Sequence, residues 1–284
     1  AWAVVVRRRV RWTAPRLPER RAGLTVRDSG GGGAATAVFL HGLAGSGRYF
    51  GAEFEALAPE LRVVVPDLLG FGRSPRPTDS RYRVDDHVDA ILDTLEELGA
   101  TGQLVLVGHS TGCVLALAVA QRVPNRVRAV VGFGPAVYRD AAHARGQLEG
   151  LGLMTRLFLL DSDVGQRLCR WSCENRARSG ALAPLLRPDL PGPIARDGVE
   201  HNWISYSRTL RHVIVESGSL AWLQGATCPV HFVVGSRDGV PDVDALTGKA
   251  LELDSVTVEV WPGGHDLPLT SPERCRDLIR SYAA

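Results

Sequence analysis

The chain has 284 residues, of which 45% are hydrophobic and 23% charged, and its formal net charge at pH 7 is +2. This length and composition are typical of a globular protein with one large α/β domain or two small domains. The small net charge excludes a strongly basic nucleic-acid-binding surface, and no apolar run reaches the roughly 20 residues that cross a bilayer. We therefore expect neither a nucleic-acid partner nor stable membrane insertion.

Cysteine usage and the amino-terminal segment both favour a cytoplasmic protein. Five cysteines, an odd number spread along the chain, do not form a disulfide framework. Cys169 and Cys173 lie four residues apart and can share a helix face, but no His/Cys cluster accompanies them in the sequence. We expect buried reduced thiols there and no structural zinc. The segment from Trp2 to Trp12 contains three consecutive arginines and lacks the apolar core of a signal peptide.

The first half of the chain alternates between apolar strand patterns and helical patterns. We predict strands at 3–12, 24–28, 36–40, 62–65, 104–107 and 127–133, and helices at 49–58, at 86–98 and directly after residue 110. Such alternation is typical of a parallel sheet that helices cover on both faces.

The alternation stops at Pro135. From 136 to 220 the sequence predicts no buried strand, and helical patterns at 148–160 and 164–175 precede a proline-rich region. An insertion of this length is not an ordinary loop. It is predicted to be helical.

The sheet resumes after the insertion. Strands are predicted at 229–235 and 255–261, and a last helix at 272–283. We therefore predict an α/β core domain formed by residues 1–135 and 221–284, with a mostly parallel, doubly wound sheet of about eight strands. Residues 136–220 form the helical insertion.

A Gly-x-Ser-x-Gly sequence at 108–112 connects the strand at 104–107 to the helix that follows. A turn this tight holds the serine backbone in a strained conformation, which its glycine neighbours permit. Ser110 is then lifted above the carboxyl edge of the sheet, and the helix amides that begin at Thr111 point toward the atom that it attacks. Because short glycine–serine patterns arise by chance among 31 glycines, a serine that merely caps the helix is the alternative.

A second glycine-rich bend, from His41 to Gly47, follows the strand at 36–40. Its backbone amides, Leu43 first, are candidates for one half of an oxyanion hole. A plain strand-to-helix loop is the alternative. We expect His41 and His109 to support the two bends through hydrogen bonds and not to act as bases.

The partners of a nucleophilic serine are expected on loops that follow later strands. A serine hydroxyl needs a base within hydrogen-bond reach and a third group that orients that base. Asp238 follows the strand at 229–235, and His265 follows the strand at 255–261. The order Ser, Asp, His is the one that the nucleophile-elbow architecture uses. Asp242, which more plausibly caps the next helix, and Asp266, which is close to His265 in sequence, are alternatives to Asp238.

Four segments carry a resemblance to a known family. They are His-Gly at 41–42, Asp-x-x-Gly-x-Gly-x-Ser at 67–74, Gly-His-Ser-Thr-Gly at 108–112 and Gly-Gly-His-Asp-Leu-Pro at 263–268. The chain resembles the capped esterases, lipases and carbon–carbon hydrolases of the α/β-hydrolase fold from about 36 to 280. The resemblance implies a cap formed by 136–220, and it implies these roles: Ser110 as nucleophile, His265 as general base and then acid, Asp238 as orienting carboxylate, and the amides of Leu43 and Thr111 as the oxyanion hole.

The expected activity is that of a serine hydrolase that cleaves a small to medium, largely apolar carboxylic ester through an acyl-enzyme. A serine where haloalkane dehalogenases and epoxide hydrolases of this fold place an aspartate argues against both reactions. No metal constellation or dinucleotide fingerprint is present, so we expect no metal and no cofactor. Large side chains in the insertion and just after it predict an apolar pocket for a small-molecule substrate, although most of them more plausibly pack within the fold than contact substrate: Phe158, Leu159, Leu160, Trp171, Trp203, Tyr206 and Trp222.

Three other functions use the same architecture. Two are enzymatic: hydrolysis of a carbon–carbon bond in a β-diketone-like substrate, and acyl transfer to an alcohol or peroxide. The third is a receptor-like member that binds a ligand without turnover. The sequence does not decide between a monomer and a homodimer.

Overall fold

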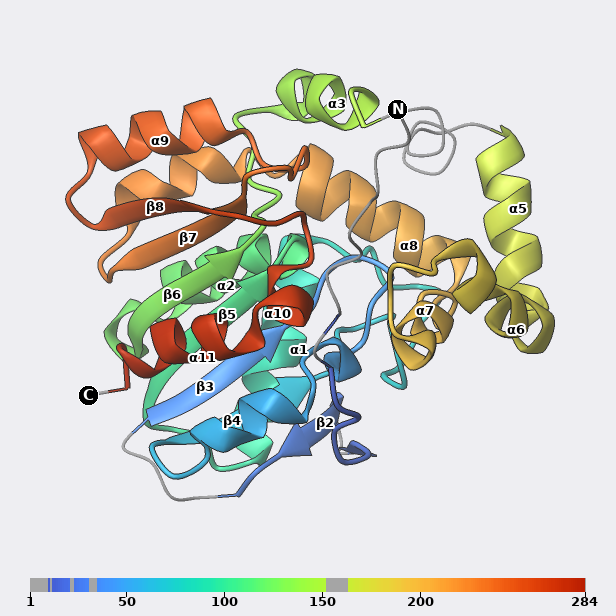
Figure 1. Cartoon of the computed structure of the whole chain (residues 1–284), viewed down its shortest axis with the longest axis horizontal. Coiled ribbons are helices and arrows are strands. Elements are labelled where there is room, and N and C mark those ends of the chain that lie inside the picture. Colours follow the sequence, from blue (N-terminus) through green and yellow to red (C-terminus); the bar gives the residue numbers. More distant parts are fainter. Residues whose placement is uncertain (1–9, 11, 21–22, 31–34, 152–162, 284) are drawn as a thin grey trace, which may run out of the picture.

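The computed structural model describes residue 10 and residues 12–20, 23–30, 35–151 and 163–283. In this part of the chain eight strands form one sheet, in the order β1-β2-β4-β3-β5-β6-β7-β8 (Figure 1). The strands are β1 (Glu19–Arg20), β2 (Thr25–Asp28), β3 (Ala35–Leu40), β4 (Leu61–Pro66), β5 (Gln103–His109), β6 (Val127–Phe133), β7 (Val230–Gly235) and β8 (Val256–Trp261). The pairs β1–β2 and β2–β4 are antiparallel, and all other neighbouring strands are parallel.

Helices cover both faces of this sheet. The elements of the core are η1 (Gly47–Tyr49), η2 (Ala52–Leu57), α1 (Val84–Glu97), α2 (Thr111–Arg122), η3 (Pro124–Arg126), α9 (Val243–Glu252), α10 (Leu267–Thr270) and α11 (Pro272–Arg280). Alternate residues of the central strand β5 enter different apolar layers: Leu104 and Leu106 pack with α1, α2 and α9, whereas Val105 and Val107 pack with η2 and α11. This alternation explains why the central strands are apolar throughout, as is usual for strands buried on both faces.

Between β6 and β7 the chain forms a group of helices, which we call the insert (residues 136–220). It contains α3 (Ala141–Glu149), α5 (Asp163–Glu174), α6 (Arg176–Leu186), α7 (Gly192–Asp197), α8 (Trp203–Thr209) and the π-helical turn η4 (Leu210–Val215); the short η5 (Ser219–Gly225) follows. No described residue of the insert belongs to a strand. Figure 1 shows α5, α6, α7 and α8 grouped on one side of the sheet, the side toward which β3 points.

The predicted fold class is confirmed, with local differences. The segment 49–58 forms the 3₁₀ turns η1 and η2 and not one α-helix, because Gly51 interrupts it. α3 ends at Glu149, and most of the helix predicted at 148–160 lies outside the described residues, as does most of the strand predicted at 3–12. The two-residue strand β1 was not predicted.

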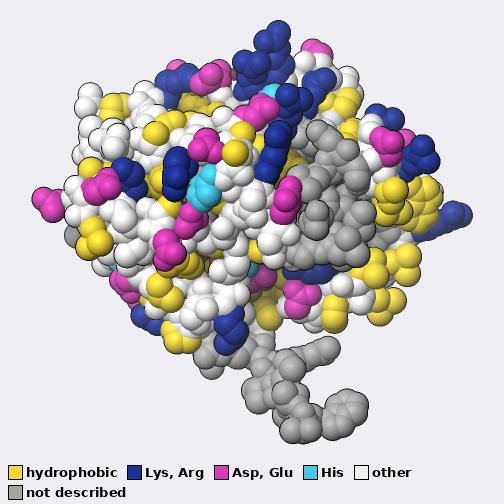
Figure 2. Space-filling model, turned by 90° about the horizontal axis from the view of Figure 1, so that it is seen from above, with side chains coloured by type: hydrophobic (Ala, Val, Ile, Leu, Met, Phe, Trp, Pro, Cys, Tyr) yellow, Lys and Arg dark blue, Asp and Glu magenta, His cyan; other side chains and the backbone are white. Residues whose placement is uncertain are grey.

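The distribution of charge on the surface and the polarity of the helices are those expected from the small net charge and the lack of long apolar runs. Basic and acidic side chains are interspersed over the face in Figure 2. Across the described ranges, every helix is too short or too polar to span a bilayer.

The sheet order places two loops side by side at its centre. From β3 the chain moves to β4 on one side of β3, whereas β5 pairs with the other side of β3, with Leu40 opposite Gly108. Ligands of open α/β sheets bind at such a switch point, beyond the carboxyl ends of the strands. The bend after β3 and the turn after β5 both start there.

Candidate active site

Ser110 occupies a strained turn between β5 and α2. Its φ and ψ angles are 54° and −117°, in a region that residues with a side chain rarely adopt. A Cβ on Gly108 would lie 2.6 Å from the backbone of Cys113, and a Cβ on Gly112 would overlap the carbonyl oxygen of Leu40. The Gly-x-Ser-x-Gly pattern is therefore a packing requirement of this turn. Ser110 makes no side-chain capping hydrogen bond to α2, so the geometry does not support the capping alternative.

His265 and Asp238 form a hydrogen-bonded pair. Nδ1 of His265 lies 2.9 Å from Oδ2 of Asp238, whose other oxygen accepts the Val240 N–H at 2.9 Å. The Asp238 side chain is 1% exposed and that of His265 is 28% exposed. Burial lowers the pKa of His265, but the hydrogen bond and the charge of Asp238 outweigh burial, so the pKa of His265 is raised above its ordinary value. Because Nδ1 donates to the carboxylate, Nε2 of the neutral ring is left as the basic nitrogen.

Two glycines make room for this pair. Gly134, directly after β6, has a φ of 56°, and a Cβ there would lie 2.8 Å from His265 Nδ1 and 2.9 Å from Asp238 Oδ2. A Cβ on Gly235 would overlap the carbonyl of Gly264, where the loops after β7 and β8 meet. Sequence reasoning did not assign Gly134 this part. Its only signal was a Gly-Pro pair at the end of a strand.

The two alternative carboxylates face other partners. Asp242 accepts the Ala245 N–H at 3.0 Å as the N-cap of α9, and it lies 2.5 Å from Nε2 of His143. Asp266 accepts a hydrogen bond from the Tyr49 hydroxyl at 3.1 Å. Of these three carboxylates, Asp238 is the one that contacts the imidazole of His265.

His41 and His109 support the bends, as the sequence predicts. His41 Nε2 accepts the Leu68 N–H at 2.9 Å, so its Nδ1 donates to the carbonyl of Gly42 at 2.8 Å. Nε2 of His109 donates to the carbonyl of His265 at 3.2 Å, and its ring stacks on Tyr49 with centroids 4.3 Å apart. Burial lowers the pKa of both histidines. Both rings therefore stay neutral, and their hydrogen bonds hold the two bends in place.

The Asp-x-x-Gly-x-Gly-x-Ser segment at 67–74 fastens the bend after β3. The Asp67 carboxylate accepts the N–H groups of Gly47 and Arg73, both at 2.7 Å. Gly72 has a φ of 56°, and a Cβ there would collide with the same carboxylate. Ser74 Oγ donates to the Asp67 carbonyl at 2.6 Å. This segment therefore holds the bend after β3 in position, but its residues do not line the cavity at Ser110.

The two residues named for an oxyanion hole belong to segments that meet at Ser110. Thr111 is the first residue of α2, where a helix leaves its N–H groups without an intrahelical partner. The bend that carries Leu43 packs against the turn, since a Cβ on Gly42 would lie 3.2 Å from Cβ of Ser110. Ala44, the next residue after Leu43, has a φ of 53°. A second strained residue thus lies at the site, as is common at functional loops.

A cavity of about 450 Å³ joins Ser110 and His265. The core contributes Gly42, Leu43, Ala44, Gly45, Tyr49, His109, Ser110, His265 and Asp266, and the insert contributes Ala183, Leu186, Arg187, Leu190, Ile194, Ala195, Gly198 and Val199. The wall from the insert is apolar except for Arg187, whose guanidinium pairs with Asp189 at 2.7 Å. The cavity is therefore suited to a largely apolar ligand.

Where the structure describes them, the large side chains singled out in the sequence do not form the apolar wall, in agreement with packing as their more plausible role. Trp171, Trp203 and Tyr206 are not among the lining residues, and Trp222 lies against α1 and α2 in a separate hollow. Residues 158–160 lie outside the described residues. The wall is formed by aliphatic side chains of α6 and α7 and of the segments that follow each helix, such as Leu190 and Val199.

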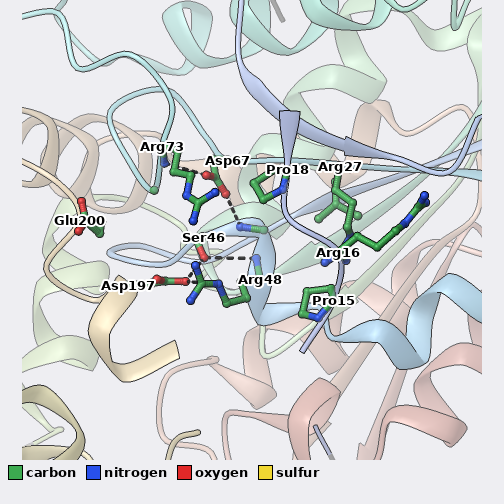
Figure 3. A pocket seen from close by; sticks show the side chains of 13 residues that line it. Pro15, Arg16, Pro18, Arg27, Ser46, Arg48, Asp67, Arg73, Asp197 and Glu200 are labelled. Carbon is green, nitrogen blue, oxygen red and sulfur yellow. Dashed lines mark hydrogen bonds and ion pairs between the residues drawn. The ribbon is translucent and has the colours of Figure 1, made fainter. Parts of the chain in front are cut away.

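A second, polar cavity of about 330 Å³ lies beside the same bend (Figure 3). It shares no described lining residue with the cavity at Ser110. Here Oδ2 of Asp197 in α7 accepts a hydrogen bond from Ser46 Oγ at 2.5 Å and lies 3.4 Å from Nε of Arg48. Burial raises the pKa of Asp197. These contacts anchor α7 of the insert to the core next to the Leu43 bend.

Comparison with known proteins identifies the fold. The family model described as alpha/beta hydrolase fold matches residues 37–164, a range that includes both bends and Ser110. The chain has the α/β-hydrolase fold. The solved structures agree with this assignment. One, an E-2-(acetamidomethylene)succinate hydrolase, aligns with a TM-score of 0.70 over 91% of this chain and 94% of its own, at 22% identity. Another, the haloalkane dehalogenase DatA from Agrobacterium tumefaciens C58, aligns with a TM-score of 0.72 over 95% and 96%, at 21% identity.

Several curated relatives are hydrolases by name, and one is a 1-acylglycerol-3-phosphate O-acyltransferase of Arabidopsis thaliana, 33% identical over 143 residues. A probable lysophospholipase of Arabidopsis thaliana, BODYGUARD 1, is 33% identical over 252 residues, which is 79% of this chain and 53% of the relative. A 2-hydroxymuconate semialdehyde hydrolase of a Pseudomonas species is 43% identical over 116 residues, 38% of each chain. The chain thus spans about half or less of the length of these relatives.

Proposed function

We propose that this protein is a serine hydrolase that cleaves small to medium, largely apolar carboxylic esters. The observation that carries the proposal is the pair of His265 and the buried Asp238, 2.9 Å apart, on the cavity that the strained Ser110 also lines. An imidazole oriented by a carboxylate, on the same cavity as a partly buried serine at a helix N-terminus, is the arrangement that activates a hydroxyl nucleophile.

Each residue has one role in the proposed reaction. Nε2 of His265 takes the hydroxyl proton as Ser110 Oγ bonds to the ester carbonyl carbon. The resulting imidazolium gives that proton to the leaving alkoxide as the carbon–oxygen bond breaks, which leaves an acyl-enzyme. Water, deprotonated by the same nitrogen, then attacks the acyl carbon. The imidazolium returns the proton to Ser110 Oγ as the bond between the acyl carbon and Oγ breaks, which releases the acid. Asp238 remains ionised and holds the ring in the required tautomer.

The amides of Leu43 and Thr111 are proposed to hold the oxyanion of each tetrahedral intermediate. Both belong to backbone fixed in unusual conformations, beside Ala44 and Ser110 respectively. Donors held rigidly in place need no reorganisation when charge develops. Loss of one such donor costs roughly 3 kcal/mol in comparable sites.

Residues 136–220 are proposed to act as a cap that selects the substrate. They supply the aliphatic wall of the cavity, and residues 1–135 and 221–284 supply the reacting groups. The volume of about 450 Å³ admits a small or medium acyl group. The name of the Arabidopsis relative supports an ester substrate, and the serine at the turn distinguishes this chain from a dehalogenase that places aspartate there.

Hydrolysis of p-nitrophenyl acetate and butyrate tests the proposal. We expect Ser110→Ala to abolish release of p-nitrophenol. The matched control is Ser236→Ala, because Ser236 is exposed on the same loop as Asp238 and does not line the cavity; this variant should keep wild-type activity. Turnover that survives in Ser110→Ala would refute the nucleophile.

Cleavage of a carbon–carbon bond is the second candidate, favoured by the Pseudomonas relative that hydrolyses 2-hydroxymuconate semialdehyde by name. A screen of esters against vinylogous diketones separates the two reactions. Faster turnover of the diketones than of any ester would replace the ester assignment and keep the triad. Ligand binding without turnover of either class would favour a receptor-like protein.

A further inference from the structure

Three buried soft-ligand side chains meet inside the insert, away from the cavity at Ser110. Cys169 and Cys173 lie one turn apart on α5, and His201 lies just before α8. Their ligand atoms all lie within 4.8 Å of one another, and the three residues are only 5–6% exposed. The sequence shows the two cysteines, but the packing of α5 against the segment before α8 adds the histidine.

Two of the three separations of these atoms match those around a tetrahedral metal, and the third, between Cys173 and His201, is within 4.8 Å. The two sulfurs are 3.9 Å apart, and Cys169 Sγ lies 3.5 Å from His201 Nε2. With bonds of about 2.3 Å to sulfur and about 2.0–2.1 Å to nitrogen, a tetrahedral zinc ion holds two sulfurs about 3.8 Å apart and a sulfur and a nitrogen about 3.6 Å apart. The side chains would move little to bind the ion.

Among the described residues, no hydrogen bond to another residue competes with the cysteines for the His201 ring. Its Nδ1 is buried without a hydrogen-bond partner, and the ring stacks on Tyr206 with centroids 5.1 Å apart. The Arg176 guanidinium donates to the His201 backbone carbonyl at 2.9 Å and so fixes the main chain there. Packing and a backbone contact therefore present Nε2 to the two sulfurs.

We propose that Cys169, Cys173 and His201 bind one zinc ion, with water as the fourth ligand. Two thiolates and an imidazole are the ligands that zinc prefers, and they leave no net charge on the buried centre. Binding releases the two thiol protons to solvent as the two zinc–sulfur bonds form, and no oxidant takes part.

The ion would brace the wall of the substrate cavity. His201 lies two residues beyond Val199, which lines that cavity, and α5 leads directly into α6, which contributes Ala183 and Leu186. A bond between α5 and His201 therefore ties together the segments on both sides of the lining residues. The site is separate from the reacting groups, since none of its three residues lines the cavity at Ser110.

Zinc alone, added to metal-free full-length protein, tests this proposal. After removal of excess metal we expect one equivalent of bound zinc by elemental analysis. The change of Cys169→Ser, Cys173→Ser or His201→Asn should weaken binding by at least about 100-fold. Cys228→Ser is the matched control, because Cys228 is an equally buried free thiol outside the cluster, and it should bind like the wild type.

Cobalt(II) binding to the unmodified chain gives a test that needs no variant to fold. Tetrahedral thiolate coordination predicts sulfur-to-cobalt charge-transfer absorption and intense visible bands. Absence of these bands, zinc binding below one equivalent, or equal binding by the three variants would overturn the proposal.

Thiol counting distinguishes the metal from a disulfide. All five cysteines should titrate after the zinc-bound protein is kept in air and then denatured with a chelator. Three thiols, with Cys169 and Cys173 joined, would overturn the proposal in favour of a redox pair. Ser110→Ala should bind zinc like the wild type, so failure of the metal site and failure of the proposed hydrolase are separate results.

Discussion

At the scale of single residues, Asp238 sets both the tautomer and the basicity of His265. Its carboxylate oxygens receive the imidazole N–H and the Val240 amide, so the carboxylate has no freedom to turn toward another partner. A buried carboxylate in this position favours the protonated imidazole and holds the ring with Nε2 free. Two predictions follow from this one contact.

Asp238→Asn should lower kcat/KM for p-nitrophenyl butyrate by about 10⁴-fold, because an amide permits the wrong tautomer of His265. Asp242→Asn serves as the control on the same loop. An asparagine caps a helix as well as aspartate does, so activity should stay within a few-fold of wild type. Equal losses in the two variants would contradict the assignment of Asp238.

The pH profile of kcat/KM measures the effect of the Asp238 contact on the pKa of His265. The neutral imidazole is the base, so activity should rise with pH through the pKa of His265. Because Asp238 raises that pKa, the midpoint of this acid limb should lie above the ordinary imidazole value of about 6.5. In Asp238→Asn the residual activity should show a midpoint shifted to lower pH, since burial remains and the charge is gone. A midpoint that does not move would show that another group titrates.

Gly134→Ala tests whether the His265–Asp238 pair needs the space that a glycine leaves at position 134. Its control measures the separate effect of backbone strain. The new methyl group would lie within 3 Å of both side chains, so we expect at least a tenfold loss of kcat. Gly99→Ala is the matched control. It has a φ of 62° and no atom within 4 Å of the added Cβ, so it should lose about 1–2 kcal/mol of stability from strain without loss of activity. Full activity in Gly134→Ala would refute the steric argument.

At the scale of secondary-structure elements, α7 connects the insert to the reacting core. It lines the cavity with Ile194 and Ala195, and its Asp197 is held by Ser46 and Arg48 beside the Leu43 bend. Asp197 is therefore a polar anchor of this wall, and the pair of Glu200 and Arg76, 3.0 Å apart, is another polar contact between the insert and the core.

Asp197→Ala should loosen this wall and raise KM several-fold while kcat changes little. The lost hydrogen bonds of a buried carboxylate should also lower the free energy of unfolding by about 1–3 kcal/mol. Steady-state kinetics and urea unfolding measure the two effects. Glu216→Gln, which breaks a more exposed ion pair with Arg211, should change neither quantity; a kcat defect as large as the KM defect in Asp197→Ala would argue against an anchoring role.

The sequence predicts the elements of the core better than those of the insert. Runs such as Val105–Val107 are buried on both faces, so their apolar pattern is set by the sheet alone. The aliphatic wall of the cavity could not be predicted, because which residues of α6 and α7 face the site depends on how separate helices cross. The aromatic residues drew attention in the sequence, yet Tyr206 stacks on His201 within the insert.

At the scale of the whole molecule, the parallel sheet explains why distant residues could be assigned to one place. Carboxyl ends of neighbouring parallel strands share an edge, so the loops carrying Ser110, Asp238 and His265 had to lie near one another. No such rule joins Cys169 and Cys173 to His201, because helices of an insertion pack without a fixed register. That Ser110, Asp238 and His265 lie at one edge of the sheet could therefore be predicted from the sequence, whereas the Cys–His cluster required the structure.

Zinc should stabilise the whole chain if the cluster binds it. At a free zinc concentration about 100 times Kd, the free energy of unfolding should rise by about 2.7 kcal/mol. Thermal or urea unfolding with and without zinc measures this increment. It should vanish in Cys173→Ser and persist in Cys228→Ser; an increment that is equal in both would mean that zinc acts elsewhere.

The measurement that tests the proposed hydrolase most directly is covalent labelling with a fluorophosphonate, read by peptide mass spectrometry. The phosphorus atom should bond to Ser110 Oγ with loss of fluoride, so the mass increment should appear on the peptide that contains Ser110 and nowhere else. Labelling should slow sharply in His265→Ala. A labelled residue other than Ser110, or labelling of Ser110 at the same rate without the imidazole, would contradict the account.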